Sequence, residues 1–144
     1  MKKIIIIGAG AMGSAFAVPC LENKNEVTLV GTHLEDELIN NIQLNDNFHP
    51  ALNIKLPSKL KVEKYKKLKS ILEGGIDIIV AGVSSVGIEW FVKQITKSYK
   101  KNLPIILLTK GLAIEGNELI TLSDKIKKLL KDQGHTDVNI SEVF

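Results

Sequence analysis

The chain has 144 residues, 44% hydrophobic and 24% charged, which is typical of a globular protein with one domain-sized core. Its net charge of +3 comes from lysines spread along the sequence, so no basic face is concentrated enough to favour nucleic acid as a partner. No apolar run is long enough to span a membrane and the single Cys20 cannot form an internal disulfide, so we expect a cytoplasmic protein.

The N-terminal stretch changes abruptly from branched apolar residues to glycines. Residues 3–7 read KIIII, which predicts a strand buried on both faces, as in a parallel sheet. The GAGAMG run at 8–13 follows at once, with the Gly-x-Gly-x-x-Gly spacing of a dinucleotide-binding turn. Gly8 permits the turn, Gly10 lets a pyrophosphate approach the backbone, and Gly13 lets the next helix press on the strand. Free N–H groups at the start of that helix would then face the phosphates. The alternative is a glycine-rich turn without a ligand.

The rest of the chain alternates helical and strand patterns. Pro19 is expected to kink or shorten the first helix, and Asn23 or Asn25 to end it in the left-handed conformation. An irregular loop is expected over 45–58. The predicted helices cover 12–21, 34–44, 65–72, 85–98 and 117–131, and the predicted strands cover 26–30, 60–62, 76–83, 104–109 and a segment from 138. This order predicts an α/β protein with a doubly wound (Rossmann), mostly parallel sheet and helices on both faces, in one dinucleotide-binding domain over 1–144.

Ligands of such a sheet bind beyond the carboxyl ends of its strands, near the point where the strand order reverses. We therefore expect the glycine turn to share one crevice with 31–33, 83–85 and 109–111. The second segment lacks the Asp or Glu that usually accepts a hydrogen bond from the NAD ribose, so NADP is not excluded. Thr32 can bind a hydroxyl or a phosphate, and His33 can add positive charge beside a 2′-phosphate. An equally good and compatible interpretation is that Thr32 caps the following helix.

Lys110 is the most informative charged residue, because it ends a predicted buried strand and precedes a glycine. Held on a rigid element, its ammonium would bind a substrate phosphate as a point charge or polarise a carbonyl oxygen. The alternative is an ordinary solvated lysine. His49 lies in the predicted loop and is interpreted as a surface residue. Ser84 and Ser85 lack the surroundings of a hydrolase nucleophile, and the sequence has no cluster with metal-ligand spacing.

Together these segments resemble the N-terminal domain of the NAD(P)-dependent glycerol-3-phosphate dehydrogenases. The resemblance rests on GAGAMG at 8–13, NEVTLVGT at 25–32, His49-Pro50 with Leu56-Pro57, Val83-Ser84-Ser85, and the more specific Thr109-Lys110-Gly111-Leu112. It implies interconversion of glycerol 3-phosphate and dihydroxyacetone phosphate by hydride transfer, with NAD or NADP as cofactor. The alternatives are the cofactor domain of a ketopantoate-reductase-like enzyme, against which the Thr-Lys-Gly-Leu segment argues, and a non-catalytic nucleotide-binding domain.

The residues and the resemblance together define the expected site. Lys110 is the expected catalytic residue, and the expected cofactor-binding residues are Gly8, Gly10, Ala11, Met12, Gly13, Thr32, His33, Val83, Ser84, Ser85 and Lys110. In the family this lysine works with a second lysine on a C-terminal helical substrate domain, which the 144 residues lack. The chain is therefore expected to bind the cofactor, to be inactive alone, and to self-associate, for example as a homodimer, through exposed apolar surface.

Overall fold

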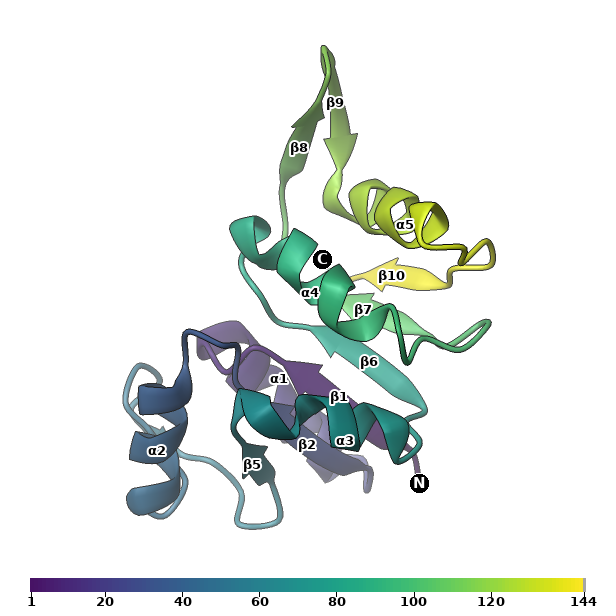
Figure 1. Ribbon diagram of the computed structural model, residues 1–144. Helices are drawn as coiled ribbons and strands as arrows, with labels where there is room; N and C mark the ends of the chain where they lie inside the picture. Colours follow the sequence, from purple (N-terminus) through teal and green to yellow (C-terminus); the bar gives the residue numbers. More distant parts are fainter. Residues whose placement is uncertain (144) are drawn as a thin grey trace.

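A computed structural model describes residues 1–143 and shows a six-stranded parallel sheet (Figure 1). The strands are β1 (Lys3–Ile7), β2 (Glu26–Val30), β5 (Lys61–Glu63), β6 (Ile78–Ala81), β7 (Ile105–Leu107) and β10 (Ile140–Glu142). They lie in the order β10-β7-β6-β1-β2-β5. The chain thus starts at the centre, builds one half of the sheet and then returns across β1 to build the other. This reversal between β1 and β6 confirms the predicted doubly wound fold.

Helices cover both faces of the sheet. They are α1 (Ala11–Glu22), α2 (Asp36–Leu44), α3 (Leu68–Glu73), α4 (Ile88–Ile95) and α5 (Leu122–Asp132), with 3-10 turns η1 (Tyr65–Lys67) and η2 (Ser85–Gly87) before α3 and α4. Alternate residues of β1 point to opposite faces: Ile5 and Ile7 pack with residues of α3, α4 and α5, whereas Ile4 and Ile6 pack with residues of α1 and α2. The prediction of a strand over 3–7 that is buried on both faces is confirmed for the four isoleucines, whereas Lys3 at its start is exposed. Among the described residues no helix has both the length and the apolar composition of a membrane span.

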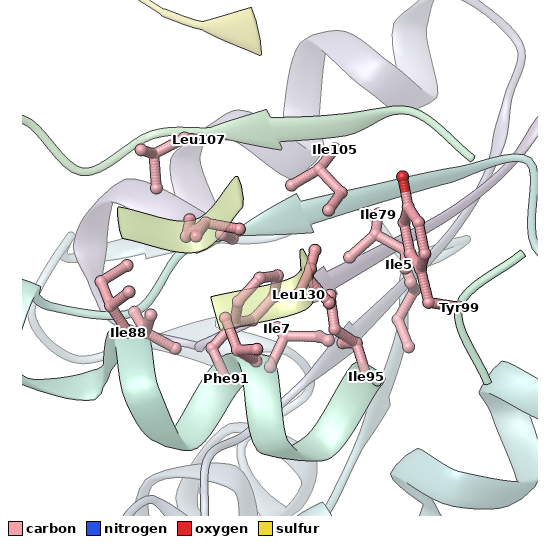
Figure 2. Close-up of a cluster of buried hydrophobic side chains, with 14 of the residues drawn as sticks. Ile5, Ile7, Ile79, Ile88, Phe91, Ile95, Tyr99, Ile105, Leu107 and Leu130 are labelled. Atoms are coloured by element: carbon pink, nitrogen blue, oxygen red, sulfur yellow. The ribbon is translucent and has the colours of Figure 1, made fainter. Parts of the chain in front are cut away.

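Figure 2 shows the core on one of these faces. Phe91 and Ile95 of α4 lie against Ile5 and Ile7 of β1 and Ile79 of β6, and these five side chains have at most 1% of their surface exposed. Burying each such side chain stabilises the fold by about 1.5–3 kcal/mol relative to exposing it. This packing fixes α4 over the centre of the sheet, and with it the turn that enters α4 beside the end of β6.

The end of α1 differs from the prediction. The helix continues through Pro19 to Glu22, and the left-handed residue that follows is Lys24, with φ of 62°, rather than Asn23 or Asn25. The two asparagines instead use their side-chain amides, which donate to the carbonyls of Pro19 (2.8 Å) and Cys20 (3.1 Å). The same two carbonyls also accept the backbone N–H groups of Asn23 (3.1 Å) and Asn25 (3.3 Å), so each asparagine closes the end of the helix with both its backbone and its side chain.

Two β-hairpins occupy segments for which no strand was predicted. β3 (Phe48–His49) and β4 (Ile54–Lys55) pair within the expected loop, and β8 (Leu112–Glu115) and β9 (Glu118–Thr121) pair where a helix was expected from 117. Gly116, with φ of 60°, forms the tight turn between β8 and β9. The hairpin β8–β9 projects from the top of the molecule in Figure 1. Helix α5 therefore starts at Leu122, where the Thr121 hydroxyl accepts the Asp124 N–H at 3.1 Å.

Candidate functional site

A cavity of about 960 Å³ opens beyond the carboxyl ends of β1, β2, β6 and β7, on both sides of the strand-order reversal. It is lined by Gly10, Ala11, Met12, Thr32, His33, Leu34, Glu35, Gly82, Val83, Ser84, Val86, Gly87, Trp90, Leu108, Thr109 and Lys110. The structure thus brings together residues that follow four different strands. Of the predicted site residues, Gly8, Gly13 and Ser85 are not in this lining.

Gly8 and Gly13, the two ends of the glycine turn, do not line the cavity. Gly8 has φ of 110°, and a Cβ there would lie 2.5 Å from the carbonyl oxygen of Gly82. A Cβ on Gly13 would lie 2.1 Å from the carbonyl oxygen of Gly8. At Gly10, by contrast, a Cβ would meet no atom within 4 Å. Two glycines therefore allow the backbone segments to cross closely, while the third leaves space open beside the turn.

The amino end of α1 forms one wall of the cavity. Gly10 precedes the helix, no side chain caps it, and its first turn contains no acidic residue. The first intrahelical bond runs from the Ser14 N–H to the Gly10 carbonyl at 3.0 Å, so the N–H groups of the first turn have no partner inside the helix. With the positive end of the helix dipole, these groups suit an anion such as a pyrophosphate.

Glu35 is a site residue that the sequence interpretation missed. The predicted strand-end segment 31–33 contains no acidic residue, but Glu35 turns back toward it, and its Oε2 accepts the N–H groups of Ala9 (2.9 Å) and Thr32 (2.8 Å). The Thr32 hydroxyl accepts the Leu34 N–H at 3.3 Å, which forms a local turn two residues before α2 rather than a cap of α2 itself. The position of Glu35 just beyond the strand end, within one turn of Thr32, was the available signal. One carboxylate therefore joins the glycine turn to the end of β2.

His33, Trp90 and Tyr65 form an aromatic cluster that contributes two side chains to the cavity. The His33 ring centroid lies 4.9 Å from that of Trp90 and 6.3 Å from that of Tyr65, and the Trp90 and Tyr65 centroids are 5.7 Å apart. His33 and Trp90 both line the cavity. Trp90 was not predicted as a site residue, because its position on α4 depends on how that helix packs against the sheet.

The segment after β7 is tied to the segment after β6. The Thr109 hydroxyl donates to the carbonyl of Val83, and the Leu108 N–H donates to the carbonyl of Ala81 at 3.1 Å. These bonds fix the backbone from which the exposed Lys110 reaches the cavity. Within residues 1–143 Lys110 has no carboxylate in ion-pair range, so its charge is available to an anionic ligand.

His49 is not the surface residue that we predicted. The structure places it fully buried at the end of β3, with its ring against the glycine turn.

In the described part of the chain, no group of three or more His, Cys, Asp or Glu side chains is arranged to hold a metal ion.

Comparison with known proteins agrees with this geometry. The family described as NAD-dependent glycerol-3-phosphate dehydrogenase N-terminus matches residues 3–140. The NADP(+)-dependent glycerol-3-phosphate dehydrogenase of Archaeoglobus fulgidus is 33% identical over 138 residues, which cover 96% of this chain and 40% of that protein. The glycerol-3-phosphate dehydrogenase [NAD(P)+] of Shouchella clausii is 36% identical over 114 residues, which cover 78% of this chain and 32% of that protein.

Solved structures share the fold. The crystal structure of glycerol-3-phosphate dehydrogenase from Coxiella burnetii superposes with a TM-score of 0.78 at 24% identity, over 98% of this chain and 40% of that chain. The chain therefore spans less than half the length of the relatives that it matches. With the family match over residues 3–140, the chain belongs to the NAD-dependent glycerol-3-phosphate dehydrogenase family and corresponds to the N-terminal part of its members.

Proposed function

We propose that the cavity binds NAD or NADP and that the chain is the cofactor-binding part of an enzyme interconverting glycerol 3-phosphate and dihydroxyacetone phosphate. The observation that carries this proposal is one cavity lined both by the start of α1, where no side chain caps the helix, and by Lys110, which has no ion-pair partner among residues 1–143. The helix start suits the pyrophosphate of a dinucleotide, and Lys110 suits the phosphate of a small substrate.

The residues present fit a dinucleotide. The open space beside Gly10 would receive the pyrophosphate, whose oxygens would accept the N–H groups of Ala11 and Met12. Gly8 and Gly13 contribute indirectly, because their close crossing sets the direction of the turn. Thr32 and His33, with Trp90 beside them, would form the adenosine side of the cavity, and His33 offers a flat ring for an adenine to stack on.

The other end of the cavity would hold the reacting groups. Val83 and Ser84 line the cavity after the central strand β6 and would flank the nicotinamide, which supplies or accepts the hydride when the cofactor is bound. Ser85 follows them outside the lining, at the start of the turn that enters α4. Lys110 would hold the substrate, either at its phosphate or at the carbonyl oxygen where negative charge develops. Thr109 supports this role, since its hydrogen bond to Val83 keeps the lysine segment beside the segment after β6.

Calorimetric titration with NADH and with NADPH, followed by dihydroxyacetone phosphate, tests the proposal. We expect at least one dinucleotide to bind, because the turn and the cavity need no further residues to form. Failure of both to bind would overturn the cofactor assignment. We further propose that residues 1–144 act as one cofactor domain that does not turn over substrate, because the relatives carry most of their length outside the matched region. Steady-state turnover by this chain alone would contradict that second proposal.

We also propose that the chain self-associates in the cytoplasm without a nucleic-acid partner. The hairpin β8–β9 supports self-association, since the side chains of Leu112, Ile114 and Leu119 lie on one of its faces and are 61%, 77% and 68% exposed. The lone Cys20 thiol suits a reducing compartment. Analytical ultracentrifugation of the wild type and of Ile114→Ser tests self-association, and we expect the variant to associate more weakly. A wild type that stays monomeric as its concentration is raised would exclude self-association.

A further inference from the structure

His49 links the hairpin β3–β4 to the glycine turn. Its fully buried ring places Nε2 at 2.8 Å from the Ala9 carbonyl oxygen, and its Nδ1 accepts the Leu52 N–H at 3.2 Å. A carbonyl oxygen only accepts and an amide N–H only donates, so the ring carries its proton on Nε2. His49 therefore donates to the turn through one nitrogen and organises its own hairpin through the other.

The receiving residue, Ala9, lies between the first two glycines of the turn. Its carbonyl accepts from His49 and also from the Ser14 hydroxyl at 3.0 Å, while its N–H donates to Glu35. Both polar groups of this residue are thus anchored by side chains, and its methyl group is fully buried. Glycines on either side allow many backbone conformations, so these anchors select one of them.

The selected conformation is the one that the proposed cofactor needs. With Ala9 fixed, Gly10 faces the cavity and the N–H groups of Ala11 and Met12 stay directed at the pyrophosphate position. A binding turn that is already ordered avoids the entropy cost of ordering when the ligand binds. Ser14 lies five residues after Ala9 in α1, and Glu35 lies 26 residues after it, beyond β2. His49 is 40 residues away in sequence and ties a separate hairpin, outside the central sheet, to the turn.

We propose that His49 is a positioning residue for cofactor binding, whose Nε2–H holds the Ala9 carbonyl and thereby fixes the glycine turn in its pyrophosphate-binding conformation. This inference rests on the proposed function, because it concerns the same cavity. It assigns to the hairpin β3–β4 a role in ligand affinity that its place outside the central sheet would not suggest.

Two substitutions separate the two ring nitrogens. His49→Gln puts an amide N–H near the position of Nε2 and keeps a donor for Ala9, whereas His49→Asn puts an oxygen near Nδ1 and keeps an acceptor for Leu52. We expect the Kd for whichever dinucleotide binds more tightly, NADH or NADPH, to rise by about tenfold in His49→Asn, from the loss of one buried hydrogen bond. In His49→Gln we expect it to rise by less than about threefold. Thermal unfolding of both variants gives their stabilities. It shows whether the loss of affinity accompanies the loss of the Ala9 hydrogen bond or only a general loss of stability.

Equal affinities of His49→Asn and the wild type, or equal weakening by both substitutions, would overturn the role of His49 while leaving the cofactor site intact. Absence of dinucleotide binding by the wild type would instead overturn the proposed function. A measurement on the wild type needs no variant to fold: the ¹⁵N shifts of the His49 ring should report the Nε2–H tautomer with and without dinucleotide. The Nδ1–H tautomer in either state would contradict the proposal.

Discussion

The carbonyl oxygen of Gly8 lies 2.1 Å from the position that a Cβ on Gly13 would take. Cβ atoms in proteins do not approach other atoms this closely, and the neighbour is backbone, so no side-chain rotation relieves the clash. We expect Gly13→Ala to lower the free energy of unfolding by about 1–3 kcal/mol or more, as overpacking does. Urea unfolding followed by circular dichroism measures this loss.

Gly10→Ala is the matched control, because the same methyl group at Gly10 would meet no atom within 4 Å. The two variants differ only in which glycine gains a Cβ. If Gly13→Ala unfolded at the same urea concentration as Gly10→Ala, the close crossing of α1 over the end of β1 would be incorrect.

A larger side chain at Gly10 tests the binding role of the turn. Gly10 has φ of −63°, which suits any residue, so Gly10→Val should change the free energy of unfolding by no more than about 0.5 kcal/mol. The valine would fill the space beside the helix start, and we expect titration with NADH or NADPH to show no binding. A folded Gly10→Val that binds the dinucleotide like the wild type would place the pyrophosphate elsewhere.

These glycines show why the centre of the fold was predictable from sequence. The four consecutive isoleucines at 4–7 predict a short strand that is buried on both faces. The three glycines have separate steric requirements, which the Gly-x-Gly-x-x-Gly spacing expresses. Likewise, the rule that ligands bind beyond the strand ends brought Thr32, Val83 and Lys110 into one predicted crevice, and all three line the observed cavity.

The missed features depend on contacts that local sequence does not encode. His49 reads as a loop residue until a hairpin carries it to Ala9, 40 residues earlier in the chain. Glu35 reads as an ordinary acidic residue at a helix start until its carboxylate turns back to the glycine turn. The hairpin around Gly116 was detectable, because Gly-Asn lies between the short runs LAIE and ELIT and favours a tight turn, but the predicted helix started at 117 and covered the second strand.

Tyr99 gives the fold a predictable response to alkaline pH. Burial raises the pKa of its phenol above the ordinary value of about 10. Its hydroxyl donates to the Leu103 carbonyl at 2.9 Å. The folded state thus keeps this proton at pH values where the unfolded state loses it. The resulting stability is fully present below about pH 10 and is lost as pH rises through the folded-state pKa.

Tyr99→Phe removes this contribution while keeping the ring that packs in the core (Figure 2). We expect the wild type to be more stable than the variant at pH 8, by about 1 kcal/mol for the lost hydrogen bond, and the difference to shrink as pH rises. Urea unfolding of both proteins across that range measures it, and the comparison cancels the titration of the lysines. A stability difference that stays constant up to pH 11 would contradict the assigned direction of the pKa shift.

Lys110 should affect the substrate more than the cofactor. It is exposed on the cavity wall, and an exposed charge contributes at most about 1 kcal/mol, so Lys110→Ala should weaken dinucleotide binding by less than about fivefold. In a chimaera of the relatives' full length that carries residues 3–140, we expect kcat/KM for dihydroxyacetone phosphate to fall on the order of a hundredfold, because the ammonium acts where charge develops. Lys59→Ala, which changes the net charge equally at an exposed position outside the cavity, is the control. Equal effects of the two substitutions on kcat/KM would show that Lys110 contributes only its share of the net charge, and a large loss of dinucleotide affinity in Lys110→Ala would move the lysine to the cofactor side of the cavity.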